Sequence, residues 1–97
     1  MNNRKVLVIN CGSSSLKFKL FLMPEGIELV HGLVERIGQK GACLKQETTD
    51  NRTFKKTMTI KNHRDAFKAI IESIVDEEKG VLSDKNDLSY YKKTYNP

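Results

Sequence analysis

The chain has 97 residues, a formal net charge of +5 and an isoelectric point near 9.3. This length allows one small domain at most, and 38% hydrophobic with 30% charged residues is typical of a globular protein rather than a disordered one. The basic residues occur as singles and pairs among twelve acidic residues. Such scattered charge usually indicates a solvated surface, so composition argues against nucleic acid as a partner.

Cysteine spacing and the N-terminal sequence indicate the cellular compartment. Cys11 and Cys43 have no C-x-x-C spacing, and the chain has only two histidines to join them, so neither a zinc site nor a disulfide framework is indicated. The apolar run Val6–Ile9 is too short for the core of a signal peptide, and no later stretch is long enough to cross a bilayer. We therefore expect a soluble, cytoplasmic protein with no membrane partner.

Two β-favouring runs flank a turn of small residues. The first is Val6–Ile9, and the second begins after the turn and ends at Leu22. In the second run the apolar residues alternate with a period of two: Leu16, Phe18, Leu20 and Leu22. We expect this apolar face to enter a core, and the face that carries Ser15, Lys17 and Lys19 to line a cleft.

The turn between the two runs is a candidate phosphate-binding loop. Gly12 permits backbone conformations and close approaches that a Cβ would forbid. Ser13, Ser14 and Ser15 add hydroxyl donors to a row of backbone N–H groups, which together could cradle phosphate oxygens. A serine-rich hairpin turn with no ligand is the alternative interpretation of the same residues.

Two residues beside the turn extend this hypothesis. Lys17 would neutralise phosphate charge as a compact point charge. The amide oxygen of Asn10 could bind a hydrated Mg²⁺ ion directly or through water. Neither the Walker-type loop nor the G-x-G-x-x-G fingerprint is present, and a strand rather than a helix follows the turn.

Further elements follow in chain order. The sequence Pro-Glu-Gly at 24–26 predicts a turn, and strands are expected over 27–37, 42–47 and 54–60. His31 in the third strand is expected to be a packed or hydrogen-bonded residue rather than a ligand.

One helix is expected after the strands. Asn62 is a good N-cap with Asp65 three residues later, and Gly80 supplies a C-terminal stop. The apolar positions recur at helical spacing: Phe67, Ile70, Ile71, Ile74 and Val75. Strands followed by one covering helix indicate the α/β or α+β class.

A family resemblance adds to this interpretation. Residues 6–18, Val-Leu-Val-Ile-Asn-Cys-Gly-Ser-Ser-Ser-Leu-Lys-Phe, resemble the N-terminal signature of acetate kinases and their propionate kinase relatives, an apolar strand followed by Asn-x-Gly-Ser-Ser-Ser-x-Lys. The resemblance continues more weakly through residues 32–36 and the later helix, and it ends near Ser89. It implies an α/β fold, the N-terminal part of an actin-like, sugar kinase and heat-shock ATPase (ribonuclease H-like) domain, with a mixed β-sheet and one covering helix.

The resemblance also implies a reaction and roles for individual residues. By motif position, Asn10 would be the magnesium-associated asparagine, Ser13 and Ser15 the phosphate-loop serines, and Lys17 the lysine on the nucleotide side. The family moves a phosphoryl group between ATP and a short-chain carboxylate, with Mg²⁺ as cofactor and ADP and an acyl phosphate as products. Acetate and propionate are both open as substrates, and the family is expected to form homodimers.

The resemblance assigns residues 1–89 to the N-terminal part of such a domain and residues 90–97 to a tail outside the family. All three tyrosines fall in this tail, a pattern that a frameshift would produce and that an ordinary exposed tail also explains. Because acetate kinases are several times longer, their catalytic residues are expected beyond this chain. We expect the chain alone to be inactive and, with an exposed sheet edge, prone to self-association.

Two other functions remain open at this point. One is a nonenzymatic nucleotide- or phosphate-binding module, which would bind Mg²⁺-nucleotide without turnover. The other is a small basic nucleic-acid-binding protein, whose affinity would fall steeply with salt.

Overall fold

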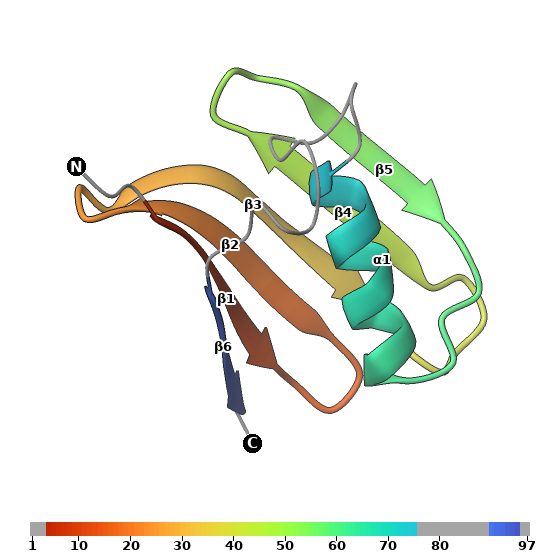
Figure 1. Cartoon of the computed structure of the whole chain (residues 1–97). Coiled ribbons are helices and arrows are strands. Elements are labelled where there is room, and N and C mark those ends of the chain that lie inside the picture. The colour runs from red at the N-terminus through yellow and green to blue at the C-terminus, as the bar shows by residue number, and fades with distance from the viewer. Residues whose placement is uncertain (1–3, 76–89, 96–97) are drawn as a thin grey trace.

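The computed structural model describes residues 4–75 and the backbone of residues 90–95. Its elements in chain order are β1 (Arg4–Cys11), β2 (Leu16–Met23), β3 (Ile27–Glu35), β4 (Cys43–Thr48), β5 (Thr53–Thr57), α1 (His63–Val75) and β6 (Tyr90–Tyr95) (Figure 1). No helix in this described part is both long enough and apolar enough to cross a membrane.

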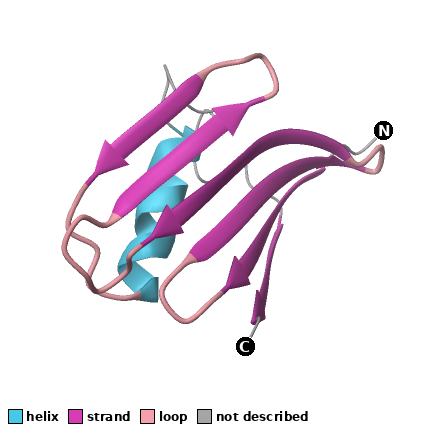
Figure 2. Cartoon of the chain, turned by 180° about the vertical axis from the view of Figure 1, so that it is seen from behind, coloured by secondary structure: helices cyan, strands magenta, loops and turns pink. Residues whose placement is uncertain are grey.

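The strands form one mixed sheet in the order β5-β4-β3-β2-β1-β6. Neighbours from β1 to β5 are antiparallel, and β6 is parallel to β1. The helix α1 packs on one face, where it contacts β3 and β4, and it lies in front of the sheet in Figure 1 and behind it in Figure 2. The expected α/β arrangement, a mixed sheet with one covering helix, is therefore confirmed.

The core lies between the sheet and α1. Alternate residues of β1 and β2 enter it, and the ring of Phe18 is only 1% exposed. That ring lies against the backbone of Gly32 on β3, where a Cβ would collide with Phe18 and with the Lys45 carbonyl group. The absence of a side chain at Gly32 therefore makes room for the largest fully buried side chain.

The expected alternation of β2 fails at its end. The pairing of β2 with β3 shifts register between Leu20 and Phe21, so Leu22 is half-buried instead of lying in the core. An extra residue on one strand interrupts the period of two, which the pattern of the isolated strand does not reveal.

The helix begins as predicted. The side-chain oxygen of Asn62 accepts a hydrogen bond from the Asp65 N–H at 2.9 Å, which satisfies one of the free donors of the first turn. Ile70 and Ile74 are fully buried, whereas Phe67, with its neighbours Ile71 and Val75, is partly buried at the border of the core. The expected stop at Gly80 lies outside the described residues.

A buried polar pair links α1 to β4. The Ser73 hydroxyl donates to Gln46 Oε1 at 2.6 Å, and the Gln46 amide donates to the Ser73 carbonyl oxygen at 3.3 Å. Both residues are at least 93% buried, with exposures of 3% for Gln46 and 7% for Ser73. Because each buried polar group has a partner, the pair avoids the cost of an unsatisfied group.

Several elements differ from expectation, most at β5 and at residues 90–97. The strand predicted over 54–60 ends at Thr57, and the chain then leaves the sheet and places Ile60 in the core. The sequence pattern assigned no element to residues 90–97, and the backbone of Tyr90–Tyr95 pairs with β1 as β6. Without it β1 would be an edge strand with unpaired N–H and C=O groups, and a run rich in tyrosine favours a strand.

Candidate functional site

The turn between β1 and β2 is tight. Cys11 pairs with Leu16 at the end of the hairpin, and the Gly12 N–H donates to the Ser15 carbonyl oxygen at 2.8 Å. A Cβ at Gly12 would lie 2.9 Å from Ser15 Oγ, closer than real Cβ contacts. A side chain at Gly12 would therefore require the Ser15 side chain to move, and the part of Gly12 in phosphate binding stays a prediction.

The serine hydroxyls of this turn are not used to build it. Ser13 is exposed, and Ser14 and Ser15 are half-buried. None of the three side chains makes a hydrogen bond to another residue in the described part of the chain. Their hydroxyl groups are therefore available to a ligand that approaches the turn.

Two residues from elsewhere in the chain hold the turn in place. The Ile37 N–H, beyond the end of β3, donates to the Ser14 carbonyl oxygen at 2.9 Å. The Nε2 atom of His63, the first residue of α1, lies 2.7 Å from the Gly12 carbonyl oxygen, which can only accept, so Nε2 carries the proton. Sequence reasoning missed His63, since it lies 51 positions after Gly12 and no local pattern links the two.

The structure brings Asn10 and Lys17 together. They are partners in the antiparallel register of β1 and β2, and such partners have Cβ atoms about 4.5–5.5 Å apart. Their neighbours Ile9 and Phe18 are buried in the core, so Asn10 and Lys17 lie on the opposite face of the sheet. No helix of the described residues covers this helix-free face. Asn10 is half-buried, Lys17 is exposed, and neither is bonded to another described side chain.

The helix-free face is hollowed into a groove of about 770 Å³. Asn10 and Lys17 line one part of the groove, and Lys55 on β5 lines another. Two other lysines of the lining are already paired: Lys19 with Glu28 at 3.4 Å, and Lys45 with Glu35 at 2.7 Å. Lys17 has no such carboxylate partner among the described residues, so its charge is free for an anion.

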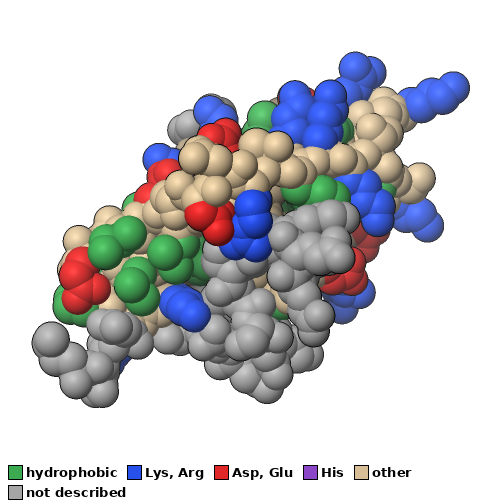
Figure 3. Space-filling model, turned by 90° about the horizontal axis from the view of Figure 1, so that it is seen from above, with side chains coloured by type: hydrophobic (Ala, Val, Ile, Leu, Met, Phe, Trp, Pro, Cys, Tyr) green, Lys and Arg blue, Asp and Glu red, His purple; other side chains and the backbone are tan. Residues whose placement is uncertain are grey.

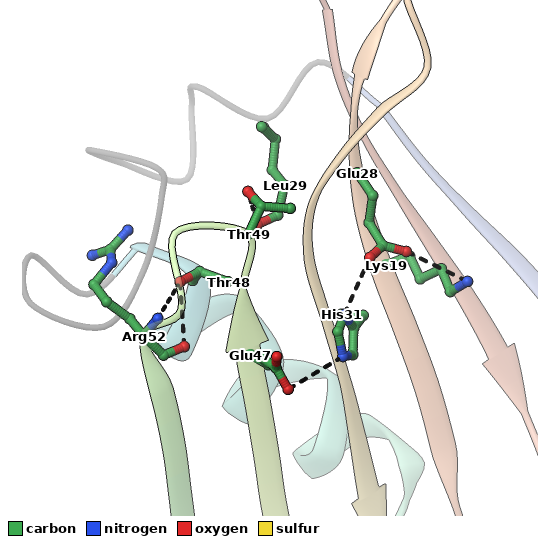
Figure 4. A network of polar contacts seen from close by, with 8 residues as sticks. All are labelled: Lys19, Glu28, Leu29, His31, Glu47, Thr48, Thr49 and Arg52. Atoms are coloured by element: carbon green, nitrogen blue, oxygen red, sulfur yellow. Dashed lines mark hydrogen bonds and ion pairs between the residues drawn. The ribbon is translucent and has the colours of Figure 1, made fainter.

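His31 lies on the same face within a network of carboxylates (Figure 4). Its Nδ1 atom is 3.1 Å from Glu28 and its Nε2 atom is 3.7 Å from Glu47. The prediction of a hydrogen-bonded histidine is confirmed, although the ring is exposed rather than packed.

The residues present can be compared with the needs of a magnesium ion. The described residues hold no cluster of three or more His, Cys, Asp or Glu side chains suited to a metal. Mg²⁺ keeps several waters and often binds through one or two protein oxygens together with phosphate. The half-buried amide of Asn10 has no partner among the described residues, so its oxygen fits the requirement for one such protein ligand.

Charge is distributed over the surface rather than gathered. In the view from above, Lys and Arg side chains project at several separate places, with Asp and Glu side chains between them (Figure 3). This is the surface pattern expected from basic residues scattered along the sequence.

Comparison with known proteins gives one consistent family. The family model described as the Acetokinase family matches residues 5–90, and the match ends next to Ser89, where the resemblance was expected to stop. An acetate kinase of Clostridium botulinum (strain Alaska E43 / Type E3) is 42% identical over 85 residues, which are 88% of this chain and 21% of that protein. An acetate kinase of Clostridium beijerinckii is 44% identical over 85 residues, with the same two shares of 88% and 21%.

Solved structures agree with the sequence comparison. The crystal structure of Porphyromonas gingivalis acetate kinase superposes with a TM-score of 0.88 at 32% identity, over 93% of this chain and 23% of that one. A propionate kinase of Francisella tularensis gives a TM-score of 0.75 at 24% identity, over 93% and 22%, and supports the fold alone. The chain thus spans about a fifth of the length of the curated relatives it matches.

Proposed function

Because the chain belongs to the acetokinase family, we propose that it carries the phosphate-binding part of an acetate kinase-like phosphotransferase. The reaction would move a phosphoryl group between ATP and a short-chain carboxylate in the cytoplasm. The observation that supports this proposal best is the pairing of Asn10 with Lys17 beside a turn whose serine hydroxyls are uncommitted.

Each residue has a role that follows from its chemistry. The hydroxyls of Ser13 and Ser15 donate to phosphate oxygens, together with backbone N–H groups of the turn. The ammonium group of Lys17 offsets phosphate charge from the helix-free face. Asn10 would supply one oxygen ligand to a Mg²⁺ ion, which when bound would neutralise charge on the phosphates.

Binding and transfer make different demands. Phosphoryl transfer requires groups that surround the transferred phosphoryl and fix both reactants, and losing them costs most of the rate. We therefore expect this chain to bind Mg²⁺-ADP and to form no acetyl phosphate. Steady acetyl phosphate production by the pure chain, abolished in Lys17→Ala, would contradict this expectation.

The chain offers a matched pair of variants for the binding test. Lys17 and Lys19 are both exposed, lie two residues apart on β2 and share one face, but only Lys19 is paired with Glu28. We expect Lys17→Ala to raise the Kd of Mg²⁺-ADP about 10-fold or more in titration calorimetry, the loss of one charged hydrogen bond. Lys19→Ala should change it less than about twofold, because its ammonium group does not meet the phosphates.

The pair also separates specific binding from general attraction. If both variants weaken binding equally, and salt weakens it steeply, the lysines act only through net charge and the proposed site is wrong. Replacing Mg²⁺-ADP by a DNA oligonucleotide in the same titration tests the nucleic-acid alternative directly.

A further inference from the structure

The hydrogen bond from His63 to Gly12 connects the first residue of the helix to the candidate phosphate loop. At 2.7 Å it is short, and the His63 ring is half-buried, so solvent competes for it less than at an open surface. His63 is itself fixed, since Asn62 accepts bonds from Asp65 and Ala66 at the helix start. The loop is thus tied to a rigid element.

The bond determines how one peptide group of the loop is oriented. In a trans peptide the C=O and the following N–H point in opposite directions. Because the Gly12 carbonyl points to His63, the Ser13 N–H points away from it, and it makes no hydrogen bond to another described residue. The bond from Ile37 to the Ser14 carbonyl fixes the Ser15 N–H in the same manner.

We propose that His63 is a positioning residue that orients the Ser13 N–H as a donor for a phosphate oxygen by holding the Gly12 carbonyl. Of the two groups that anchor the loop from outside, Ile37 acts through its backbone, so His63 is the anchor that a side-chain substitution can remove. The proposal rests on the proposed function for its ligand, but the anchoring itself is independent of any ligand.

Two variants of His63 separate anchoring from packing. In His63→Gln the side-chain amide nitrogen can occupy the place of Nε2 and donate to Gly12, whereas His63→Leu fills space and donates nothing. We expect His63→Leu to raise the Kd of Mg²⁺-ADP about 10-fold, the value of one hydrogen bond of about 1.4 kcal/mol. His63→Gln should restore the Kd to within about threefold of the wild type.

A control variant addresses loss of stability. Ile71→Ala removes a partly buried side chain from the same helix, away from the loop, and lowers the melting temperature without touching Gly12. We expect Ile71→Ala to leave the Kd of Mg²⁺-ADP unchanged. A loss of affinity that follows melting temperature across all three variants would show a packing role for His63 and overturn the proposal.

A second readout needs no nucleotide. Hydrogen exchange measured by NMR should be at least fivefold faster at the Ile37 N–H in His63→Leu, because the Ser14 carbonyl that it bonds would be less ordered, and near wild type in His63→Gln. The Leu44 N–H on β4 serves as the reference. Unchanged exchange at Ile37 in His63→Leu would overturn the anchoring, whereas changed exchange with no binding of Mg²⁺-ADP by the wild type would reject only the proposed function.

Discussion

Two of the hairpin turns of this sheet, the first turn between β1 and β2 and the second turn between β4 and β5, differ in whether their own side chains hold them. In the turn between β4 and β5, Thr48 Oγ1 accepts the Arg52 N–H at 3.0 Å and donates to Asp50, and Arg52 Nε is 3.0 Å from the Asp50 carboxylate. These side chains close the second turn, and the Thr49 N–H also donates to the Leu29 carbonyl oxygen on β3 at 3.0 Å. Figure 4 shows the Thr48 hydroxyl bonded to the backbone of Arg52. The turn between β1 and β2 is held from outside by Ile37 and His63.

The difference shows what a binding turn requires. In the second turn the polar groups are hydrogen-bonded to one another, among Thr48, Asp50 and Arg52. A ligand that binds there would have to break those bonds first. The hydroxyl groups of Ser13 and Ser15 bond no described residue, since residues distant in the sequence hold the first turn in shape. A turn that does not need its own side chains to keep its shape can be ordered and still offer their hydroxyl groups to a ligand.

The largest expected effect is on the free energy of unfolding, at Phe18 in the first hairpin. Phe18 on β2 is 1% exposed, whereas Phe54 on β5 is only partly buried. Phe18→Ala should lower the free energy of unfolding by about 3–5 kcal/mol, because it leaves a cavity that the surrounding core cannot fill. Urea unfolding followed by circular dichroism checks this, with Phe54→Ala as the partner variant. Equal costs for the two would mean that the first hairpin is no better packed than the second.

The next largest effect tests whether the stability of the protein depends on a side chain of the second turn. Thr48 is 2% exposed, and its hydroxyl closes the second turn. Thr48→Ala should cost about 1–3 kcal/mol of unfolding free energy, because the Arg52 N–H and the Asp50 carboxylate lose their partner. Thr48→Ser, which keeps the hydroxyl, should recover most of it. A Thr48→Ala protein as stable as the wild type would show that the second turn does not depend on its own side chains.

The third prediction is the converse for the first turn. Ser13→Ala should change the free energy of unfolding by less than about 0.5 kcal/mol, since the hydroxyl is exposed and bonds no described residue. The same variant should raise the Kd of Mg²⁺-ADP about 5- to 10-fold. Calorimetry and urea unfolding on one preparation give both values. A loss of stability without a loss of affinity would reverse the roles assigned to the two turns.

The smallest effect concerns pH. The Thr48 hydroxyl, and then Arg52, hold the pKa of Asp50 below its ordinary value of 3.8. Since the folded pKa is the lower one, the stabilisation is present above pH 3.8 and is lost as pH falls through the folded pKa. The melting temperature of the wild type should therefore fall slightly more than that of Asp50→Asn between pH 5 and about pH 2.5. Parallel curves would show that the second turn does not depend on the Asp50 charge.

The sequence predicted those parts of the molecule that depend on local patterns. The order strand, turn, strand over residues 6–22 follows from two β-favouring runs around a short turn, and the cap at Asn62 is a local signal that the structure confirms. The register that places Asn10 opposite Lys17 was not predicted and comes from the structure. The contact of His63 with Gly12 depends on how the helix docks, which no local pattern encodes. The assignment of residues 90–97 to a tail outside the family stays a prediction, although the backbone at 90–95 forms a strand.

The buried pair of Gln46 and Ser73 has a consequence for motion. If α1 slid along the sheet by one turn, about 5.4 Å, both polar groups would be stranded in an apolar layer. The pair therefore fixes the position of α1 on the sheet near the C-terminal end of the helix, while His63 contacts the loop at the N-terminal end. A thermal fluctuation that displaces the loop must either bend α1 or break the hydrogen bonds between Gln46 and Ser73. The helix therefore keeps the distance between the loop and β4 constant.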